Sequence, residues 1–193
     1  MSGGNYPEHM KILLGIPTIR PIRPQVVDAL MNMRRPCEVD TFVDTKGYTP
    51  SEKRNYLIVK ALNEHYDYLL FVDDDIVLPP ETLEVLLSRQ KDIIGGIYYF
   101  RGFPSERVVE LFDDNVPDEP FICKSLGGGL ILAKTEIFRK IKSPWFGTEV
   151  NEVGMTVVSE DYSFADKVRE AGYEVWCDPT LDIGHIGDHI FRK

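Results

Sequence analysis

Residues 66–80 have the sequence Tyr66-Asp67-Tyr68-Leu69-Leu70-Phe71-Val72-Asp73-Asp74-Asp75-Ile76-Val77-Leu78-Pro79-Pro80. The apolar part of this stretch is short and bounded by turn signals, which is typical of a strand buried on both faces of a sheet. The three carboxylates that follow would repel one another unless a positive group lies among them. Hard divalent cations take oxygen ligands and often also hold a substrate's phosphates. The stretch therefore predicts a cation site at the carboxyl end of a buried strand, where ligands bind in open α/β sheets. A solvated acidic turn is the alternative.

Strand-like and helix-like segments alternate along the chain around this stretch. Apolar runs predict strands at residues 11–16, 37–43, 92–100, 121–126, 130–133 and 174–177. Apolar residues at helical spacing predict helices at residues 25–33, 51–65 (capped by Ser51), 81–89, 135–141 and 159–172, with residues 143–155 irregular. This order favours parallel pairing with right-handed crossovers. The expected fold class is α/β, a Rossmann-like domain with a mostly parallel central sheet.

The size and composition of the chain indicate one folded domain. It has 193 residues, of which 43% are hydrophobic and 27% are charged, as in globular proteins. We expect a lead-in at residues 1–10, a domain at 11–187 and a tail at 188–193. The net charge of −9 argues against a general nucleic-acid binder, which needs a basic face.

The cysteines and the hydropathy of the chain bear on its compartment. Cys37, Cys123 and Cys177 are widely spaced and odd in number, which favours reduced thiols over a disulfide framework or a zinc site. The sequence has no apolar run long enough to span a bilayer, and its first residues lack a signal-peptide pattern. A soluble, cytoplasmic protein is the expectation.

Three motifs, taken in order, resemble a known family. They are Asp73-Asp74-Asp75 after a buried strand, Glu160-Asp161 opening a late helix, and the run from Cys177-Asp178-Pro179 to Gly184-His185-Ile186-Gly187. Together they resemble the nucleotide-sugar-dependent glycosyltransferases of the GT-A fold, especially family-2-like members, over most of residues 11–187. The resemblance implies transfer of a sugar, of the hexosyl type, from a UDP- or GDP-linked donor to an unidentified acceptor hydroxyl, with Mn²⁺ or Mg²⁺ as cofactor.

The resemblance also implies roles for individual residues in the metal and catalytic sites. Asp75 and His185 would bind the metal, and Asp73 and Asp74 would face the ribose and diphosphate. A metal would neutralise the diphosphate leaving group. Asp161 would be the general base that deprotonates the acceptor hydroxyl, which favours inversion of configuration. Hydrogen bonding in a turn is the alternative for His185, and helix capping is the alternative for Asp161.

Further residues are assigned to the nucleotide by the same resemblance. Pro17 and Thr18 follow the first strand, Asp44 follows the second, where relatives contact the base, and Arg54 lies in the second helix. Arginine suits phosphate binding, although an exposed helical charge is the alternative for Arg54.

The acceptor side is less defined by the sequence. Gly127-Gly128-Gly129 resembles a segment that lines the acceptor in relatives, or forms a flexible turn. Trp145 and Phe146 could stack on a sugar, although aromatic side chains more often lie in the core. His189 matches no motif, and we expect it at the surface.

Two other functions fit parts of the pattern. Asp73-Asp74-Asp75-Ile76-Val77 also fits the motif of haloacid-dehalogenase-like phosphatases, in which the first aspartate is the nucleophile, but that motif normally follows the first strand. The other is a domain that binds a nucleotide sugar without turnover. Metal-dependent donor hydrolysis would distinguish an enzyme from a binder, and acyl-phosphate trapping at Asp73 would reveal a phosphatase.

Overall fold

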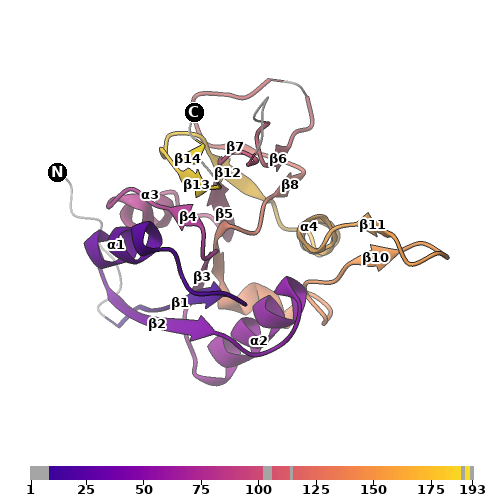
Figure 1. Ribbon diagram of the computed structural model, residues 1–193, viewed down its shortest axis with the longest axis horizontal. Helices are drawn as coiled ribbons and strands as arrows, with labels where there is room; N and C mark the ends of the chain where they lie inside the picture. Colours follow the sequence, from indigo (N-terminus) through magenta and orange to yellow (C-terminus); the bar gives the residue numbers. More distant parts are fainter. Residues whose placement is uncertain (1–8, 102–105, 114, 188–189, 192–193) are drawn as a thin grey trace.

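The computed structural model describes residues 9–101, 106–113, 115–187 and the backbone of 190–191. In these residues a seven-stranded sheet has the order β2-β1-β3-β9-β5-β12-β7 (Figure 1). Its strands are β1 (Lys11–Pro17), β2 (Glu38–Asp44), β3 (Tyr68–Val72), β5 (Ile93–Gly96), β7 (Phe121–Ile122), β9 (Leu130–Lys134) and β12 (Trp176–Asp178). This is the central sheet that the predicted α/β fold requires.

Strand direction in this sheet is mixed. β1 is parallel to β2 and β3, and β12 is parallel to β5. β9 is antiparallel to both of its neighbours, and β7 is antiparallel to β12. Five of the seven described strands therefore run one way, as the alternation of elements predicted, and two are reversed. The reversal of β9 places its first residues beside the last residues of β3.

Helices cover both faces of the sheet. They are α1 (Pro24–Asn32), α2 (Pro50–Asn63), α3 (Thr82–Ser88), the short 3₁₀ helix η1 (Thr135–Arg139) and α4 (Glu160–Glu170). The side chains of β1 and β3 alternate between two apolar layers, so that Leu13 and Phe71 pack towards α2, η1 and α4, while Leu14 and Val72 pack towards α1 and α3. These strands are covered on both faces, which explains why their sequences are continuously apolar.

The N-cap of the second helix lies two residues before the predicted cap. Thr49, not Ser51, is its N-cap: the Thr49 hydroxyl accepts from the backbone N of Glu52 at 3.2 Å, and Glu52 in turn accepts from the backbone N of Thr49 at 3.1 Å. This is a capping box, and Pro50 suits the first helical position because it needs no N–H donor there. The prediction of Ser51 as the cap was wrong, because Pro50 is the first helical residue and Thr49 precedes it as the cap.

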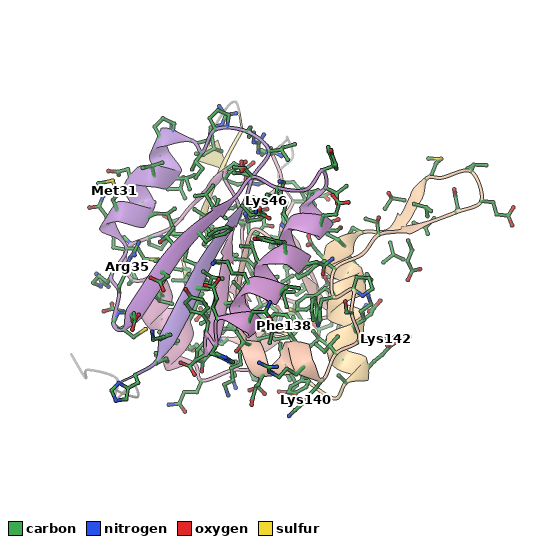
Figure 2. The ribbon with its side chains drawn as sticks, turned by 90° about the horizontal axis from the view of Figure 1, so that it is seen from below. Met31, Arg35, Lys46, Phe138, Lys140 and Lys142 are labelled. Atoms are coloured by element: carbon green, nitrogen blue, oxygen red, sulfur yellow. The ribbon has the colours of Figure 1, made fainter. Side chains whose placement is uncertain are left out.

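Three other elements differ from the sequence predictions. The helix expected at 135–141 is the short η1. The run 121–126 divides into β7 and β8 (Ser125–Leu126), and β8 pairs with β6 (Val109–Glu110). The segment expected to be irregular carries a hairpin of β10 (Glu149–Val150) and β11 (Thr156–Val158). Figure 2 shows this hairpin extending away from the body of the protein.

A small three-stranded sheet completes the frame of the site. It has the order β14-β13-β4, with β4 (Ile76–Val77), β13 (Gly184–Ile186) and β14 (Ile190–Phe191). β13 is antiparallel to β4, and His185 lies opposite Ile76. This pairing brings the C-terminal region of the chain next to the aspartate triplet.

The structure also shows the state of the cysteines and the lengths of the apolar helices. Cys37, Cys123 and Cys177 are free thiols. Among the described helices, none is both long and apolar enough to cross a bilayer.

Candidate functional site

The three consecutive aspartates occupy the turn between β3 and β4. The backbone N of Asp73 donates to the carbonyl of Gly129 at 3.0 Å, and the backbone N of Ile76 donates to the carbonyl of Asp73 at 3.2 Å. These bonds fix the turn against the reversed strand β9. Asp73 pairs with Arg54, whereas Asp74 and Asp75 share Arg20.

Arg54 of α2 links Asp73 to the start of α4. Its guanidinium lies 2.9 Å from Asp73, 3.2 Å from Glu160 and 3.8 Å from Asp161, and its side chain is 4% exposed. Burial alone would lower the pKa of Arg54, but the surrounding carboxylates outweigh burial and raise the pKa. Arg54 is therefore a permanently charged centre of the site, and not the exposed helical charge considered as its alternative.

Asp161 lies in the first turn of α4 and faces the glycine segment. Burial raises the pKa of Asp161 to about 6. Its Oδ1 is buried and has no hydrogen-bond partner among the described residues. The Asp161 side chain is 22% exposed, and a partly exposed carboxylate with a raised pKa can accept a proton from a bound hydroxyl.

Gly128 packs directly against this pair. A Cβ added at Gly128 would lie 2.5 Å from Arg54 Nη2 and 2.6 Å from Asp161 Oδ1. Only glycine fits there without displacing one of them. The neighbouring Gly129 donates its backbone N to the Tyr98 hydroxyl at 3.0 Å. The glycine segment thus forms one wall of the site.

His185 lies next to Asp75. Its Nδ1 is 2.7 Å from the carbonyl of Tyr99, and because a carbonyl can only accept, Nδ1 is the donor. In the neutral imidazole Nε2 then carries the lone pair, and it lies 3.5 Å from Asp75 Oδ1. Burial would raise the pKa of Asp75, but a hydrogen bond from the protonated form of His185, together with the charges of Arg101 and Arg20, lowers it. His185 is thus oriented as metal-binding histidines commonly are.

The donor set fits a divalent ion shared with a ligand. Among the described residues, no group of three or more His, Cys, Asp or Glu side chains is arranged to hold a metal. Asp75 and His185 supply two donors, and Mg²⁺ sites commonly use one or two protein ligands together with substrate phosphates. The two residues could therefore hold Mn²⁺ or Mg²⁺ with a diphosphate completing the coordination.

Three of the predicted nucleotide-binding residues, Pro17, Thr18 and Asp44, lie together at the carboxyl ends of β1 and β2. Pro17 lies opposite Asp44 in the parallel register, and the backbone N of Thr18 donates to the carbonyl of Asp44 at 3.0 Å. The Thr18 hydroxyl donates to Asp74. Asp44 Oδ1 accepts from the backbone N of Lys46 at 2.8 Å, whereas Oδ2 is buried without a partner among the described residues. An unused carboxylate oxygen suits a ligand N–H.

Two arginines of this site were not found by sequence reasoning. Arg20 contacts Asp74 at 2.8 Å and Asp75 at 2.6 Å, and Arg101 contacts Asp75 at 3.0 Å. Arg20 follows β1 and Arg101 follows β5, each in an irregular segment. A single arginine in a loop carries no periodic or motif signal, so only the fold reveals the pairing.

Trp145 and Phe146, which were considered for stacking on a sugar, are buried in the core. Trp145 is 8% exposed and Phe146 is 1% exposed. Phe146 stacks on Phe164 of α4 with ring centroids 4.3 Å apart. These contacts support the helix that carries Asp161. His189 lies outside the described residues.

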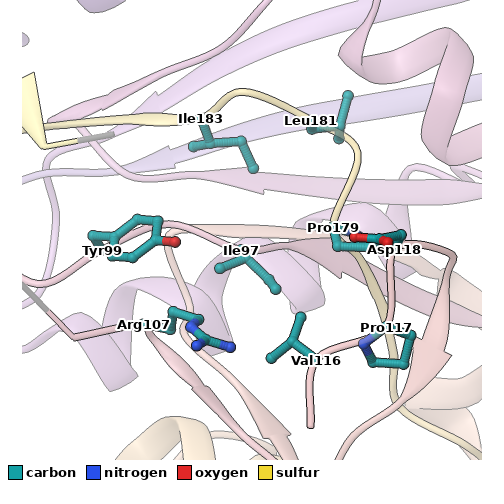
Figure 3. Close-up of a pocket in the computed structure, with 9 residues that line it drawn as sticks. All are labelled: Ile97, Tyr99, Arg107, Val116, Pro117, Asp118, Pro179, Leu181 and Ile183. Atoms are coloured by element: carbon teal, nitrogen blue, oxygen red, sulfur yellow. The ribbon is translucent and has the colours of Figure 1, made fainter. Parts of the chain in front are cut away.

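A cavity of about 240 Å³ is lined by residues that follow β5, by residues 116–118 and by residues 179–183 (Figure 3). Ile183, two residues before His185, lines it, and so does Tyr99, whose carbonyl binds His185. The rest of its wall combines apolar side chains with the charged side chains of Arg107 and Asp118. Tyr99 therefore contacts both the cavity and His185.

Comparison with known proteins relates the fold to solved structures. No protein-family model matches the chain, and no curated protein sequence matches it. The structure of A197 from STIV matches with a TM-score of 0.68 and 21% identity, over 95% of this chain and 94% of that chain. The structure of S. aureus TarS 1–349 in complex with UDP-GlcNAc matches with a TM-score of 0.52 and 14% identity, over 95% of this chain and 58% of that chain. At such identities the matches establish the fold, and the chain has the GT-A fold of nucleotide-sugar glycosyltransferases.

Proposed function

We propose that this protein transfers a sugar from a nucleoside diphosphate sugar to an acceptor hydroxyl, using Mn²⁺ or Mg²⁺, with inversion at the anomeric carbon. The observation that carries the proposal is the arrangement around Arg54 and the aspartate triplet. Asp161 and the Asp75–His185 pair lie at one edge of the sheet, separated by Asp73 and Arg54. A base for the acceptor and a cation site for the leaving group are the two parts that this reaction needs.

Each residue of the site would have its own role in the reaction. Asp75 and His185 would hold the metal, which when bound supplies positive charge for the diphosphate leaving group. Asp161 accepts the proton of the acceptor hydroxyl as the acceptor oxygen bonds to the anomeric carbon. The bond from that carbon to the phosphate oxygen breaks, and its electron pair leaves with the nucleoside diphosphate. Arg54 holds Asp73 and Asp161 in place and offsets their charge.

The contacts of Asp73 disfavour the phosphatase alternative. Arg54 Nη2 lies 2.9 Å from one oxygen of Asp73 and 3.1 Å from the other. A nucleophilic aspartate needs an oxygen free to attack phosphorus. In addition, Asp73 follows the third strand along the chain, where the phosphatase motif would follow the first.

Calorimetric titration of UDP and GDP, with and without Mn²⁺, tests the donor site. The wild type is expected to bind one of them in a metal-dependent way, and Asp75→Ala is expected to lose that binding. Asp166→Ala is the matched control, because Asp166 is an exposed aspartate that pairs with Arg169 on α4. If neither nucleotide bound with any metal, the proposal would be overturned.

Donor hydrolysis then separates an enzyme from a binding domain. With the nucleotide identified, the wild type should release nucleoside diphosphate from the matching sugar donor slowly in water and faster with an acceptor. Asp161→Asn should still bind the donor but release none. Binding without release in the wild type would favour the non-catalytic alternative.

A further inference from the structure

Arg20 and Arg101 cover the aspartates from the solvent side. Their side chains are 42% and 43% exposed, whereas those of Asp74 and Asp75 are each 7% exposed. Both guanidiniums bind the same oxygen, Asp75 Oδ2, while the other oxygen faces His185. A ligand that enters from solvent therefore meets these two arginines first.

The side chains around the aspartate triplet carry an excess of negative charge, which must be offset before a diphosphate can bind. The cluster of ion pairs contains five carboxylates, on Asp73, Asp74, Asp75, Glu160 and Asp161, and three guanidiniums, on Arg20, Arg54 and Arg101. It is negative by two charges with His185 neutral. A divalent cation offsets this excess, and a diphosphate then needs cations that can turn towards it.

Arg54 cannot serve this purpose, because it is buried and pairs with three carboxylates. Arg20 and Arg101 can. Arg20 holds Asp74 Oδ1 through Nε at 3.0 Å and Nη2 at 2.8 Å, so it can release Asp75 and remain anchored. Arg101 follows the segment whose Tyr99 carbonyl orients His185. Guanidinium groups bind phosphate oxygens with two parallel hydrogen bonds.

We infer that Arg20 and Arg101 are phosphate-binding residues that occupy Asp75 until a divalent metal binds, and then transfer to the diphosphate of the donor. The inference rests on the proposed function. A metal ion on Asp75 weakens the attraction between this carboxylate and the two guanidiniums, because all three cations share one negative charge. Metal and arginine therefore compete for Asp75, whereas arginine and metal cooperate in holding the diphosphate.

The inference predicts that one substitution changes the affinity for the metal and the affinity for the diphosphate in opposite directions. Arg101→Ala should bind Mn²⁺ alone several-fold more tightly than the wild type, since a competing cation is gone. The same variant should bind UDP or GDP in saturating Mn²⁺ roughly tenfold to a hundredfold more weakly, as expected for loss of a hydrogen bond between charged groups. Binding of the nucleoside without phosphates should not change. Arg20→Ala should show the same signs with a smaller gain in metal affinity, because removing Arg20 also frees Asp74.

Titration calorimetry with Mn²⁺ alone, and with nucleoside, nucleoside monophosphate and nucleoside diphosphate in saturating Mn²⁺, measures both effects. Arg101→Lys is the second variant: it keeps the charge and loses the two-pronged geometry, so its metal affinity should stay near that of the wild type while its diphosphate affinity falls. Arg34→Ala is the control, because Arg34 is exposed and pairs with Glu81 and Glu84 near α3.

Opposite signs for the two affinities in Arg101→Ala would support the inference. Affinities that fall together, or that both equal those of the wild type, would overturn it while leaving the proposed function in place. If the wild type bound no nucleotide, the proposed function would fail and the inference with it.

Discussion

Arg54 binds both oxygens of Asp73, at 2.9 and 3.1 Å. Arg54 lies in α2, and Asp73 directly follows β3. The same guanidinium reaches Glu160, which is 106 residues away in the sequence. One buried cation therefore joins Asp73, which directly follows β3, to the start of α4, which carries Asp161. Several predictions about stability and activity depend on this link.

Removal of Arg54 should destabilise the fold. Arg54→Ala leaves Asp73, Glu160 and Asp161 without their shared cation, and breaking a buried ion pair in this way costs about 3–5 kcal/mol. Urea unfolding followed by circular dichroism measures the loss. Arg54→Lys should recover part of it, because the charge is kept. Arg34→Ala, at an exposed pair, should leave stability almost unchanged, and an equal loss in both alanine variants would contradict the argument.

The pH dependence of turnover should report Asp161. Because the pKa of Asp161 is raised to about 6, its carboxylate is mostly protonated below that pH, and the rate should rise with pH and level off above it. A rate independent of pH between about pH 5 and about pH 7 would remove Asp161 from the role of base.

The effect of Asp161 on stability should depend on pH in the opposite direction: stability should fall, and not rise, as the pH increases. The folded state raises the pKa of Asp161 above its ordinary value, so folding favours the protonated form. Its contribution is most favourable at low pH and is lost as the pH rises towards about 6. Asp161→Asn should therefore gain stability relative to the wild type on going from about pH 4 to about pH 7.5, as measured by urea unfolding. Asp166→Asn, an exposed change on the same helix, is the control, and an equal gain in both would contradict this account.

Gly128→Ala should impair catalysis more than folding. The added methyl group meets Arg54 Nη2 and Asp161 Oδ1, so one of the two must move. Displacement of a reacting group by about an ångström can cost roughly 100-fold in rate. Steady-state kinetics should show a lower kcat with little change in donor affinity. Gly147→Ala is the matched control, because the added methyl group there meets no described atom within 4 Å; similar losses in both variants would argue against a local effect.

Asp44→Asn should change the preferred nucleobase. The substitution keeps an oxygen for the backbone N of Lys46 and replaces the unpartnered Oδ2 with an amide NH₂. If Oδ2 accepts from the ring N–H of uracil or guanine, affinity for that nucleotide should fall about tenfold. Cytosine presents a ring acceptor at the equivalent position and should bind better to the variant. Titration of UDP, GDP and CDP tests this, and unchanged affinities for all three would place the base elsewhere.

The sequence allows the proximity of residues that belong to motifs to be predicted. The resemblance to GT-A glycosyltransferases implies that Asp75 and His185 share one metal site, and in the structure the two side chains lie 3.5 Å apart. The direction of β9 could not be predicted, because an apolar run has the same composition in either orientation. Arg20 and Arg101 were missed for a related reason: each acts from a loop, and a pairing between distant loops depends on the tertiary fold. The misplacement of the Ser51 cap was avoidable, since Thr49-Pro50-Ser51-Glu52 is itself a capping-box sequence.

The β10–β11 hairpin is paired within itself and stands apart from the central sheet. Its turn is closed locally, with Asn151 Oδ1 accepting from the backbone N of Met155 at 2.9 Å and Gly154 at a φ of +80°. Residues inserted or deleted in this turn would not shift the register of any strand in the central sheet. Yet the hairpin ends at Val158, three residues before Asp161. Evolution and protein engineering can therefore vary its length and sequence close to Asp161, the proposed base, while the rest of the fold is inherited unchanged.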